Sequence, residues 1–540
     1  MGPILVHTDG MHWDVPIEMS EAEEKFCQRL GVRSRFFCFL RRVRHVLFDP
    51  EFEGQLAASY TQRPSGKTPV PPAMLAMTVL LQAYTGASDA EAIERIKADN
   101  RWQLVLGCLG AEELAFCQKT LAFFRLRMVE AGSDQQLLAR TVQVAKDSGL
   151  FDSKKVGKLR IAVDSAPLEG AGRVEDTFNL IGHAIRNLVK AVVDEGAFTE
   201  RQIVRGAGLT VVGKGSVKAR LDIDWNDKQA QTQALRKLVH EAESLQSWLE
   251  SGAPELSRVE EVQLALQTLR RVIDQDTEPD PDGTGLRIKQ GVAPDRQISL
   301  SDPDMRHGRK SSARRIDGYK RYITGELTSG LAVAACALPA NVPESAGADK
   351  MRSEIEQHGR IVEMQIDRAF LPSEVTRDVH EQGGRIVSKP YTSPNGELFS
   401  KQQFGVDLDR HEVRCPAGQQ APIDGDIARF PMETCEQCPL RSQCQKPTAR
   451  MGRTVSIHAQ EQLLQELQRE VQTSAGRKKL RQRTAIEHNL AHHCNRQGPR
   501  ARYRGTRKND FDARRIAALN NLIVIAAGSS NGEALESMAA

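Results

Sequence analysis

The sequence predicts a mixed α/β core that is interrupted by insertions and preceded by an all-helical domain. Three observations indicate this fold class. Apolar residues recur at three- and four-residue spacing through the first 150 residues, which is typical of amphipathic helices. A β-rich run at 161–165 is followed by a long helical stretch, and further β-rich runs return only after residue 296. Four cysteines then gather between residues 415 and 444, among glycine- and proline-containing turns.

The composition fits a multidomain globular protein. The chain has 540 residues, of which 40% are hydrophobic and 27% charged, and its length predicts three or four domains. No segment combines a basic region with an apolar core, and no apolar run approaches the ~18 residues that span a bilayer. We therefore expect a cytoplasmic protein without membrane contact. In that compartment cysteines are expected as buried thiols or metal ligands rather than as disulfides.

Residues 1–150 are expected to form a compact helical domain. Helices are predicted at 21–30, 71–84, 89–98 and 119–129. Pro71 and Pro72 stand at one helix start, and Ser88 or Asp89 is available as the N-cap of the next helix. Arg125 and Arg127 on the last of these helices either contact phosphate or face water.

The run Ile161-Ala-Val-Asp164-Ser165 is interpreted as a buried strand that delivers one acid to the edge of a sheet. An aspartate in this position is either a metal ligand or a turn former or helix cap. Residues 176–295 are predicted to be a largely helical insertion, with helices at 178–191, 228–249 and 256–273 and a loop at 276–285. Strands are then predicted at 297–300, 318–324 and 331–338, the last two as a hairpin, followed by a helix at 345–358 and a strand at 362–366 that ends at Asp367.

Cysteines of two kinds occur in the chain. Cys415, Cys435, Cys438 and Cys444 have the spacing C-x2-C-x5-C with a fourth cysteine upstream, which fits a four-thiolate structural zinc site. The alternative is four buried free thiols. The remaining cysteines are scattered and are expected to be buried thiols: Cys27, Cys38, Cys108, Cys117, Cys336 and Cys494.

The C-terminal part carries a third acid within a basic run. A helix is predicted at 483–496, with Ile486, Leu490 and Cys494 on one face, and residues 516–527 form a mostly apolar closing segment. Between 476 and 515 there are thirteen basic residues and three acids, one of them Glu487. This run is either a surface for a polyanion or a solvated helix face. His488 and His492 also have ligand spacing, but without the His-Glu-x-x-His pattern.

Taken together, these parts resemble a bacterial insertion-sequence transposase of the DDE type, which has a helical N-terminal transposase domain and a ribonuclease-H-like catalytic core. The segments that carry the resemblance are 70–82 with 86–91, Ala162-Val-Asp-Ser165, 298–304 with Gly308-Arg-Lys310 and Gly318-Tyr-Lys320, Gln365-Ile-Asp-Arg-Ala-Phe370, and Arg483-x3-Glu487. Some related transposases carry Tyr three residues before this Arg and Lys seven residues after the Glu. This chain has Leu480 and Cys494 there.

The resemblance implies a DNA transposase, a metal-dependent polynucleotidyl transferase that cleaves insertion-sequence ends and joins the 3′-hydroxyl to target DNA. Asp164, Asp367 and Glu487 would be the catalytic residues and would hold two Mg²⁺ or Mn²⁺ ions, since hard carboxylates suit these cations. Other acids near the proposed strands compete for this role: Glu169, Glu175, Asp176, Asp302 and Asp304. The alternative function, from another class, is that of a catalytically inactive transposase-derived DNA-binding protein.

The expected partners are double-stranded DNA, as terminal inverted repeats and target, and a second copy of the chain, because synapsis of two ends suits a homodimer. The expected location is the bacterial cytoplasm, in association with the nucleoid. Expected DNA contacts are Arg309, Lys310, Lys320, Arg483, Arg496, Arg500, Arg502, Arg504 and Lys508. The expected division is 1–150 DNA-binding and dimerisation domain, 151–175 and 296–400 catalytic core, 176–295 helical insertion, 401–460 cysteine-rich zinc module, and 461–540 catalytic helix with basic tail.

Overall fold

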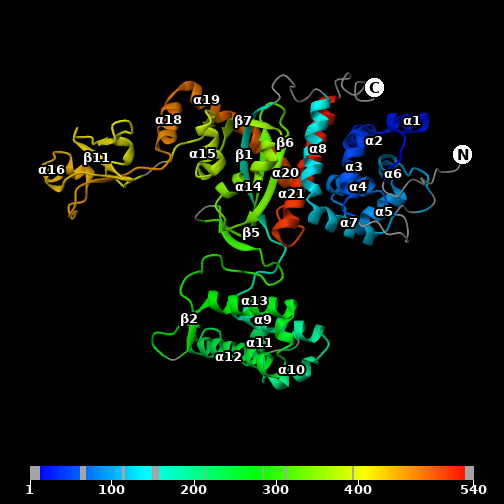
Figure 1. Ribbon diagram of the computed structural model, residues 1–540, viewed down its shortest axis with the longest axis horizontal. Helices are drawn as coiled ribbons and strands as arrows, with labels where there is room; N and C mark the ends of the chain where they lie inside the picture. The colour runs from blue at the N-terminus through cyan, green and yellow to red at the C-terminus, as the bar shows by residue number, and fades with distance from the viewer. Residues whose placement is uncertain are drawn as a thin grey trace.

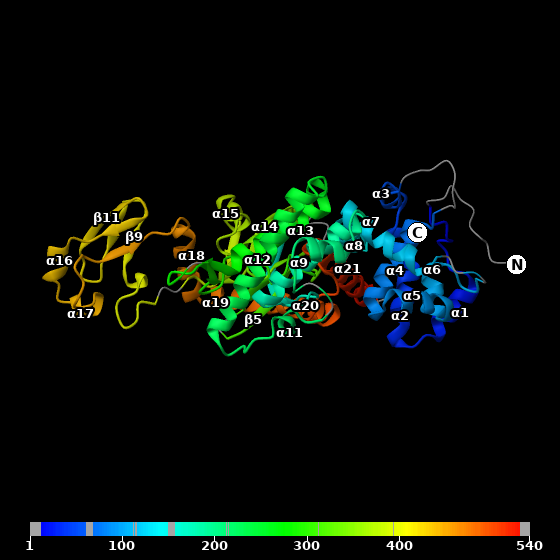
Figure 2. The ribbon, with the colours of Figure 1, turned by 90° about the horizontal axis from the view of Figure 1, so that it is seen from below.

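The computed structural model describes residues 12–529, apart from 61–68, 112, 114–115, 149–156, 212, 214, 284, 311–312 and 392–393. A mixed sheet with its helices lies in the middle, and the N-terminal helices pack on one side of it (Figure 1). The β-rich cysteine module lies at the opposite end of the molecule, as the view from below also shows (Figure 2). The predicted mixed α/β protein with a helical N-terminal region is confirmed. Among the helices of the described residues, none is both long and apolar enough to cross a membrane.

The described residues of the N-terminal region form helices and connecting loops without strands, as predicted. Ser88 caps one helix with a reciprocal pair of hydrogen bonds, because its Oγ accepts from the Glu91 N–H at 3.2 Å while Glu91 Oε2 accepts from the Ser88 N–H at 2.7 Å. The elements are α1 (Glu21–Arg29), η1 (Val32–Ser34), α2 (Arg35–Leu47), α3 (Pro50–Ala57), α4 (Pro72–Thr85), α5 (Asp89–Ala98), α6 (Asn100–Leu106), α7 (Gln118–Ala131) and α8 (Ser133–Asp147).

Two expectations for this region are wrong. Cys117 was expected as a buried thiol, but it follows a loop at the start of α7 and is exposed. Cys27 and Cys38 were expected as free thiols, but the structure joins them in a disulfide with their Cα atoms 5.8 Å apart. The sequence could not indicate this pair, because its two cysteines belong to different helices, α1 and α2, whose packing brings them together.

The central sheet contains six strands. Its path runs β4-β5-β1-β7-β8, and β6 also pairs with β5. Strands β1 and β5, β5 and β6, and β4 and β5 are antiparallel, whereas β1 and β7 and then β7 and β8 are parallel. The strands are β1 (Gly157–Glu169), β4 (Arg306–Arg309), β5 (Arg315–Glu326), β6 (Ala332–Pro339), β7 (Gly359–Gln365) and β8 (Arg385–Val387), accompanied by α14 (Ser345–Glu356), η4 (Arg368–Phe370) and α15 (Glu374–Glu381).

Two predictions for the sheet need correction. Asp164 does not end its strand, because β1 continues to Glu169. Its pairing with β7 ends at Ala162, so Asp164 pairs with β5 alone. The strand predicted at 297–300 is irregular. The backbone turns after this segment, and Ser299 Oγ accepts a hydrogen bond from the Asp302 N–H at 3.2 Å. The β5–β6 hairpin, α14 and β7 are confirmed.

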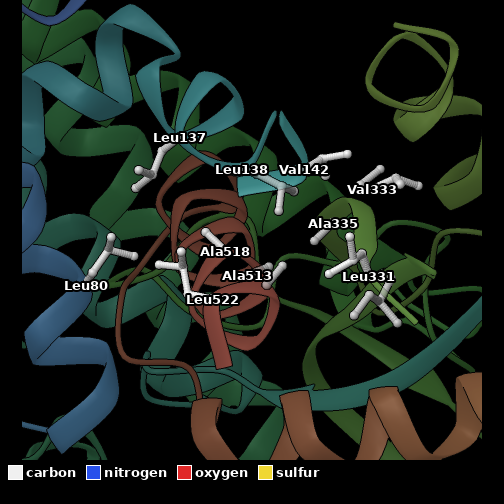
Figure 3. Close-up of a cluster of buried hydrophobic side chains, with 14 of the residues drawn as sticks. Leu80, Leu137, Leu138, Val142, Leu331, Val333, Ala335, Ala513, Ala518 and Leu522 are labelled. Carbon is white, nitrogen blue, oxygen red and sulfur yellow. The ribbon is translucent and has the colours of Figure 1, made fainter. Parts of the chain in front are cut away.

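Helix α21 (Thr506–Ser529) joins the N-terminal region to the sheet. Figure 3 shows Ala518 and Leu522 of this helix beside Leu80 of α4 and Leu137 of α8, with the side chains of β6 on its other side. These side chains are buried within one continuous core. The apolar closing segment predicted at 516–527 is therefore an interior helix, and the two regions share their packing.

The insertion forms a separate helical body with its own apolar core (Figure 1). Its helices confirm the prediction at 178–191, 228–249 and 256–273, and the predicted loop at 276–285 lies within a short hairpin. The elements are α9 (Thr177–Asp194), α10 (Glu200–Gly206), α11 (Val217–Leu221), α12 (Lys228–Gly252), η3 (Leu256–Arg258), α13 (Glu260–Asp276), β2 (Thr277–Pro279) and β3 (Leu286–Ile288).

The cysteine module is a small antiparallel sheet of order β13-β12-β11-β10-β9 with a core of its own. Two helices then lead back to the central sheet. The elements are η5 (Lys401–Gln403), β9 (Gly405–Asp407), β10 (Glu412–Arg414), β11 (Gln420–Asp424), β12 (Ile427–Arg429), α16 (Met432–Glu436), α17 (Arg441–Cys444), β13 (Thr454–Ser456), α18 (Glu461–Gln472), α19 (Ser474–Gln482) and α20 (Thr484–Gln497).

Candidate active site

Two of the predicted acids meet because of strand register. Strand β1 pairs in parallel with β7 as far as Ala162 opposite Gln365. Asp164 and Asp367 each follow these partners by two residues. Since side chains two residues apart lie on the same face of a strand, the register directs both acids to one place beyond the last β1–β7 pair.

The third acid comes from α20, which packs across the same sheet. Glu487 lies in the first turn of α20. One face of this helix is fixed by the buried side chain of Ile486 and by Asn489, whose Nδ2 donates to the Gly330 carbonyl at 2.9 Å. The Glu487 side chain is 55% exposed, and that of Asp367 is 52% exposed. Both carboxylates are therefore open to solvent beside the more deeply placed Asp164.

Arg483 connects the three acids. Its guanidinium nitrogens lie 3.9 Å from Asp164 Oδ2, 3.8 Å from Asp367 Oδ1 and 3.7 Å from Glu487 Oε1. The residue stands at the junction of α19 and α20, where it is the C-cap of the first helix and the N-cap of the second. A single cation thus lies within ion-pair distance of all three predicted catalytic carboxylates.

The acids also affect one another electrostatically. Burial raises the pKa of Asp164, the Ser165 N–H and the Arg483 guanidinium act to lower it, and the charges of Glu487 and Asp367 raise it further. The Ser165 N–H donates to Asp164 Oδ1 at 2.8 Å, and the Arg368 N–H donates to Asp367 Oδ1 at 2.7 Å. Backbone donors therefore orient both aspartates.

The donor set suits a hard divalent cation, since it consists of carboxylate oxygens around a site that already holds one positive charge. In the part of the chain that the structure describes, no three His, Cys, Asp or Glu side chains are arranged so that they could hold a metal ion as they stand. The three predicted catalytic acids are instead arranged around the Arg483 guanidinium, which lies between their carboxylates.

The competing acids are engaged in other contacts. Asp302 Oδ1 accepts from the Tyr319 hydroxyl at 2.6 Å and from the Gly505 N–H at 2.9 Å, and Asp304 Oδ2 accepts from the Thr506 N–H at 2.7 Å. The turn predicted at 302–304 therefore holds the start of α21.

Three other acids lie near β1 or after it. Glu169 Oε2 accepts from the Asp317 N–H at 3.2 Å. Glu175 pairs with His183 at 2.5 Å. Asp176 caps α9. These contacts give each acid a structural role.

The four module cysteines surround one small cavity. Cys415, Cys435, Cys438 and Cys444 line a space of about 30 Å³. Two tight turns face it, because the Gly418 N–H donates to the Cys415 carbonyl at 2.9 Å and the Cys438 N–H to the Cys435 carbonyl at 3.3 Å. All four are free cysteines, and burial raises the pKa of the Cys444 thiol.

Arg453 also lines this cavity, which the cysteine spacing does not predict. Its backbone N–H donates to Cys435 Sγ at 3.5 Å, and its charge acts to lower the pKa of Cys444 against the larger effect of burial. The sequence signal that could have indicated this residue is a basic side chain directly before β13.

Three of the predicted DNA contacts also form hydrogen bonds within the protein. Lys320 is buried and its Nζ donates to the Val342 carbonyl at 3.1 Å. Arg500 Nε donates to the Gly170 carbonyl at 3.0 Å, and Arg502 Nη2 donates to the Ala87 carbonyl at 2.8 Å, so both also fix the tail to the rest of the molecule. Exposed side chains are those of Arg309, Lys310, Arg496, Arg500, Arg502, Arg504 and Lys508.

Arginines of α7 have partners within the protein. Arg125 forms a bidentate pair with Asp89, each contact at 2.5 Å. The Arg127 guanidinium lies over the Tyr60 ring, 4.4 Å from its centroid. Neither of the alternatives considered from the sequence, phosphate or water, included these contacts.

Two family models of transposases match parts of this chain. Residues 414–526, which include the four module cysteines, Arg483 and Glu487, match the family model described as "Transposase DDE domain". Residues 29–127 match the model described as "Transposase domain (DUF772)". Both matches are consistent with a DDE transposase that has an N-terminal transposase domain. Comparisons of the chain with curated proteins and with solved structures give no match.

Proposed function

We propose that this protein is a DNA transposase, a metal-dependent polynucleotidyl transferase that cleaves insertion-sequence ends and joins the 3′-hydroxyl to target DNA. The observation that carries the proposal is the meeting of Asp164, Asp367 and Glu487 around the Arg483 guanidinium. Three acids from two strands and a late helix share a site that attracts cations, although more than 100 residues separate each acid from the next along the chain.

We infer that the central sheet is ribonuclease-H-like. Three antiparallel strands, β6, β5 and β1, continue into two parallel strands, β7 and β8. This order supports the assignment of 151–175 and 296–400 to the catalytic core. The separate core of the insertion supports its assignment as a body of its own.

Asp164, Asp367 and Glu487 would hold two Mg²⁺ or Mn²⁺ ions. When bound, such ions supply an activated nucleophile and stabilise the leaving oxygen of a phosphodiester. The chain itself orients the carboxylates: the Ser165 N–H fixes Asp164, and the packing of Ile486 fixes the first turn of α20. The exposure of Asp367 and Glu487 leaves the site open to a DNA strand.

We also propose a structural zinc ion in the cysteine module. Two tight turns bring the four cysteines to one cavity whose size suits a single ion, and the thiols would have to converge further to hold it. The Arg453 N–H also donates to Cys435 Sγ at this cavity.

DNA would be held mainly through phosphates by the exposed arginines and lysines around α20 and by the N-terminal domain. A homodimer would serve synapsis of two element ends. The bacterial cytoplasm, in association with the nucleoid, is the compartment proposed for this function.

Cleavage of a duplex that carries the element's terminal repeat tests the proposal. We expect nicking that requires Mg²⁺ or Mn²⁺, stops in EDTA and is lost in Asp164→Asn. Asp147→Asn removes an exposed acid of α8 and should leave nicking unchanged. Tight binding of the repeat without nicking at any metal concentration would support the inactive DNA-binding alternative instead.

A further inference from the structure

Arg483 occupies the position between the acids where a divalent cation is needed. Its guanidinium is nearly equidistant from the three carboxylates, at 3.7 to 3.9 Å, and its side chain is 21% exposed. These distances exceed hydrogen-bond length, so the contact is electrostatic and is not a fixed bidentate pair. The nearby backbone donors orient Asp164 and Asp367 without neutralising them.

Two buried arginines, Arg514 and Arg321, are held differently. Arg514 Nη2 lies 2.6 Å from Glu354 Oε1, and Arg321 Nη2 donates to the Pro167 carbonyl at 2.9 Å. Short contacts of this kind fix a guanidinium in place. Arg483 is balanced among three acids, so a small movement from the α19–α20 junction takes it out of the site.

Electrostatic repulsion prevents the Arg483 guanidinium and a divalent cation from occupying the centre of the three acids at the same time. Three carboxylates gathered without a cation repel one another, and one guanidinium offsets part of that repulsion. A divalent cation among the same oxygens would stand a few ångströms from the guanidinium, and like charges at that distance repel strongly in a partly buried site. Metal binding therefore requires Arg483 to leave the centre of the three acids.

We propose that Arg483 is a resident counter-ion that weakens divalent-metal binding in the DNA-free protein and is drawn away by a DNA phosphate, so that DNA binding raises metal affinity. Arginine pairs with phosphate in bidentate geometry, so bound DNA gives the displaced side chain a new partner. The coupling is reciprocal, since metal bound at the acids makes Arg483 available to DNA. This inference rests on the proposed function, because it takes the three acids as the metal site.

The test is the affinity for Mn²⁺ in the DNA-free, full-length protein, measured by titration calorimetry. Arg483→Gln removes the counter-ion and should bind Mn²⁺ about tenfold more tightly than the wild type. Arg483→Lys keeps the charge and should stay within about threefold of the wild type. The matched control is Arg481→Gln, two residues away, whose exposed side chain donates to the Arg477 carbonyl; it should leave the affinity unchanged.

Two results would overturn the inference while leaving the metal site intact. One is an Arg483→Gln protein that binds Mn²⁺ no more tightly than the wild type. The other is an equal gain in Arg483→Lys, because a gain with the charge retained would not come from removing a counter-ion. Adding Asp164→Asn to Arg483→Gln separates the two proposals. If the double variant loses the tight Mn²⁺ binding, the metal binds at the three acids. Unchanged binding would refute the proposed active site itself.

Discussion

Asp134 anchors α8 to α21, and its removal should loosen the contact between the N-terminal region and the sheet. The carboxylate is fully buried. Its Oδ2 lies 2.8 Å from Arg514 Nη1, and Arg507 Nη1 donates to the same oxygen at 3.0 Å. Arg514 in turn pairs with Glu354 of α14. The network therefore ties three elements together.

The size of the effect follows from what each arginine retains. Breaking a buried pair costs about 3–5 kcal/mol, because one charge is left without its partner. In Asp134→Asn, Arg514 keeps Glu354 and the Arg507 side chain is 39% exposed. We therefore expect the lower end, about 3 kcal/mol, lost from the docking of α8 on α21.

Hydrogen exchange followed by mass spectrometry measures this loss directly. Peptides from α8 and α21 should exchange about 100-fold faster in Asp134→Asn, since ~1.4 kcal/mol is a factor of ten. Peptides from α12, in the separate core of the insertion, provide an internal control. Asp147→Asn, at the exposed end of the same helix, should change exchange little. Equal exchange in the Asp134 and Asp147 variants would refute the reasoning.

Three further predictions concern the module, the DNA and α20. Protein purified without chelator should contain one zinc ion per chain, and Cys438→Ser should lose it while Cys117→Ser, at an exposed cysteine outside the module, keeps it; absence of zinc from the wild type would contradict the site. If the complex neutralises about six phosphates, log K should fall with log salt at a slope of roughly −5, and a slope near zero would exclude binding through phosphates. Burial lowers the pKa of His493 to about 3, below its unfolded value, so its contribution to stability should be lost as pH falls below about 6.5. Between pH 6.5 and 5 this is about 2 kcal/mol, a dependence that urea unfolding should show in the wild type and not in His493→Gln.

The order of helices and strands could be predicted from the sequence, because each element depends mainly on the pattern of residues within its own segment. Helical patterns located α9, α12, α13 and α14, and β-rich runs located the β5–β6 hairpin. The failures have long-range causes. Residues 297–300 look like a strand, but Ser299 and Asp302 form a turn that supports the start of α21. The Cys27–Cys38 disulfide likewise depends on how two helices pack.

The residues of the candidate site could be predicted from the sequence, but their arrangement in space could not. The acids were chosen by motif, whereas their meeting depends on the register of Ala162 opposite Gln365 and on the packing of α20. Much of the basic run proved to have contacts within the protein, as with Arg514 and Arg502. A charge run alone does not distinguish a DNA-binding surface from an interior ionic network.

The central claim is that Asp164, Asp367 and Glu487 act as one metal site, and cleavage kinetics on terminal-repeat DNA test it most directly. If Glu487 only formed an i, i+4 pair with Arg483, its loss would cost about 0.3–0.5 kcal/mol and leave cleavage nearly intact. We expect instead that Asp164→Asn, Asp367→Asn and Glu487→Gln each lower the cleavage rate at least 10²-fold with DNA binding retained. The double variant Asp164→Asn/Glu487→Gln should be little worse than either single variant, because residues that act as a unit are not additive. A Glu487→Gln protein that cuts at a near wild-type rate, or a double variant whose two losses multiply, would contradict the account.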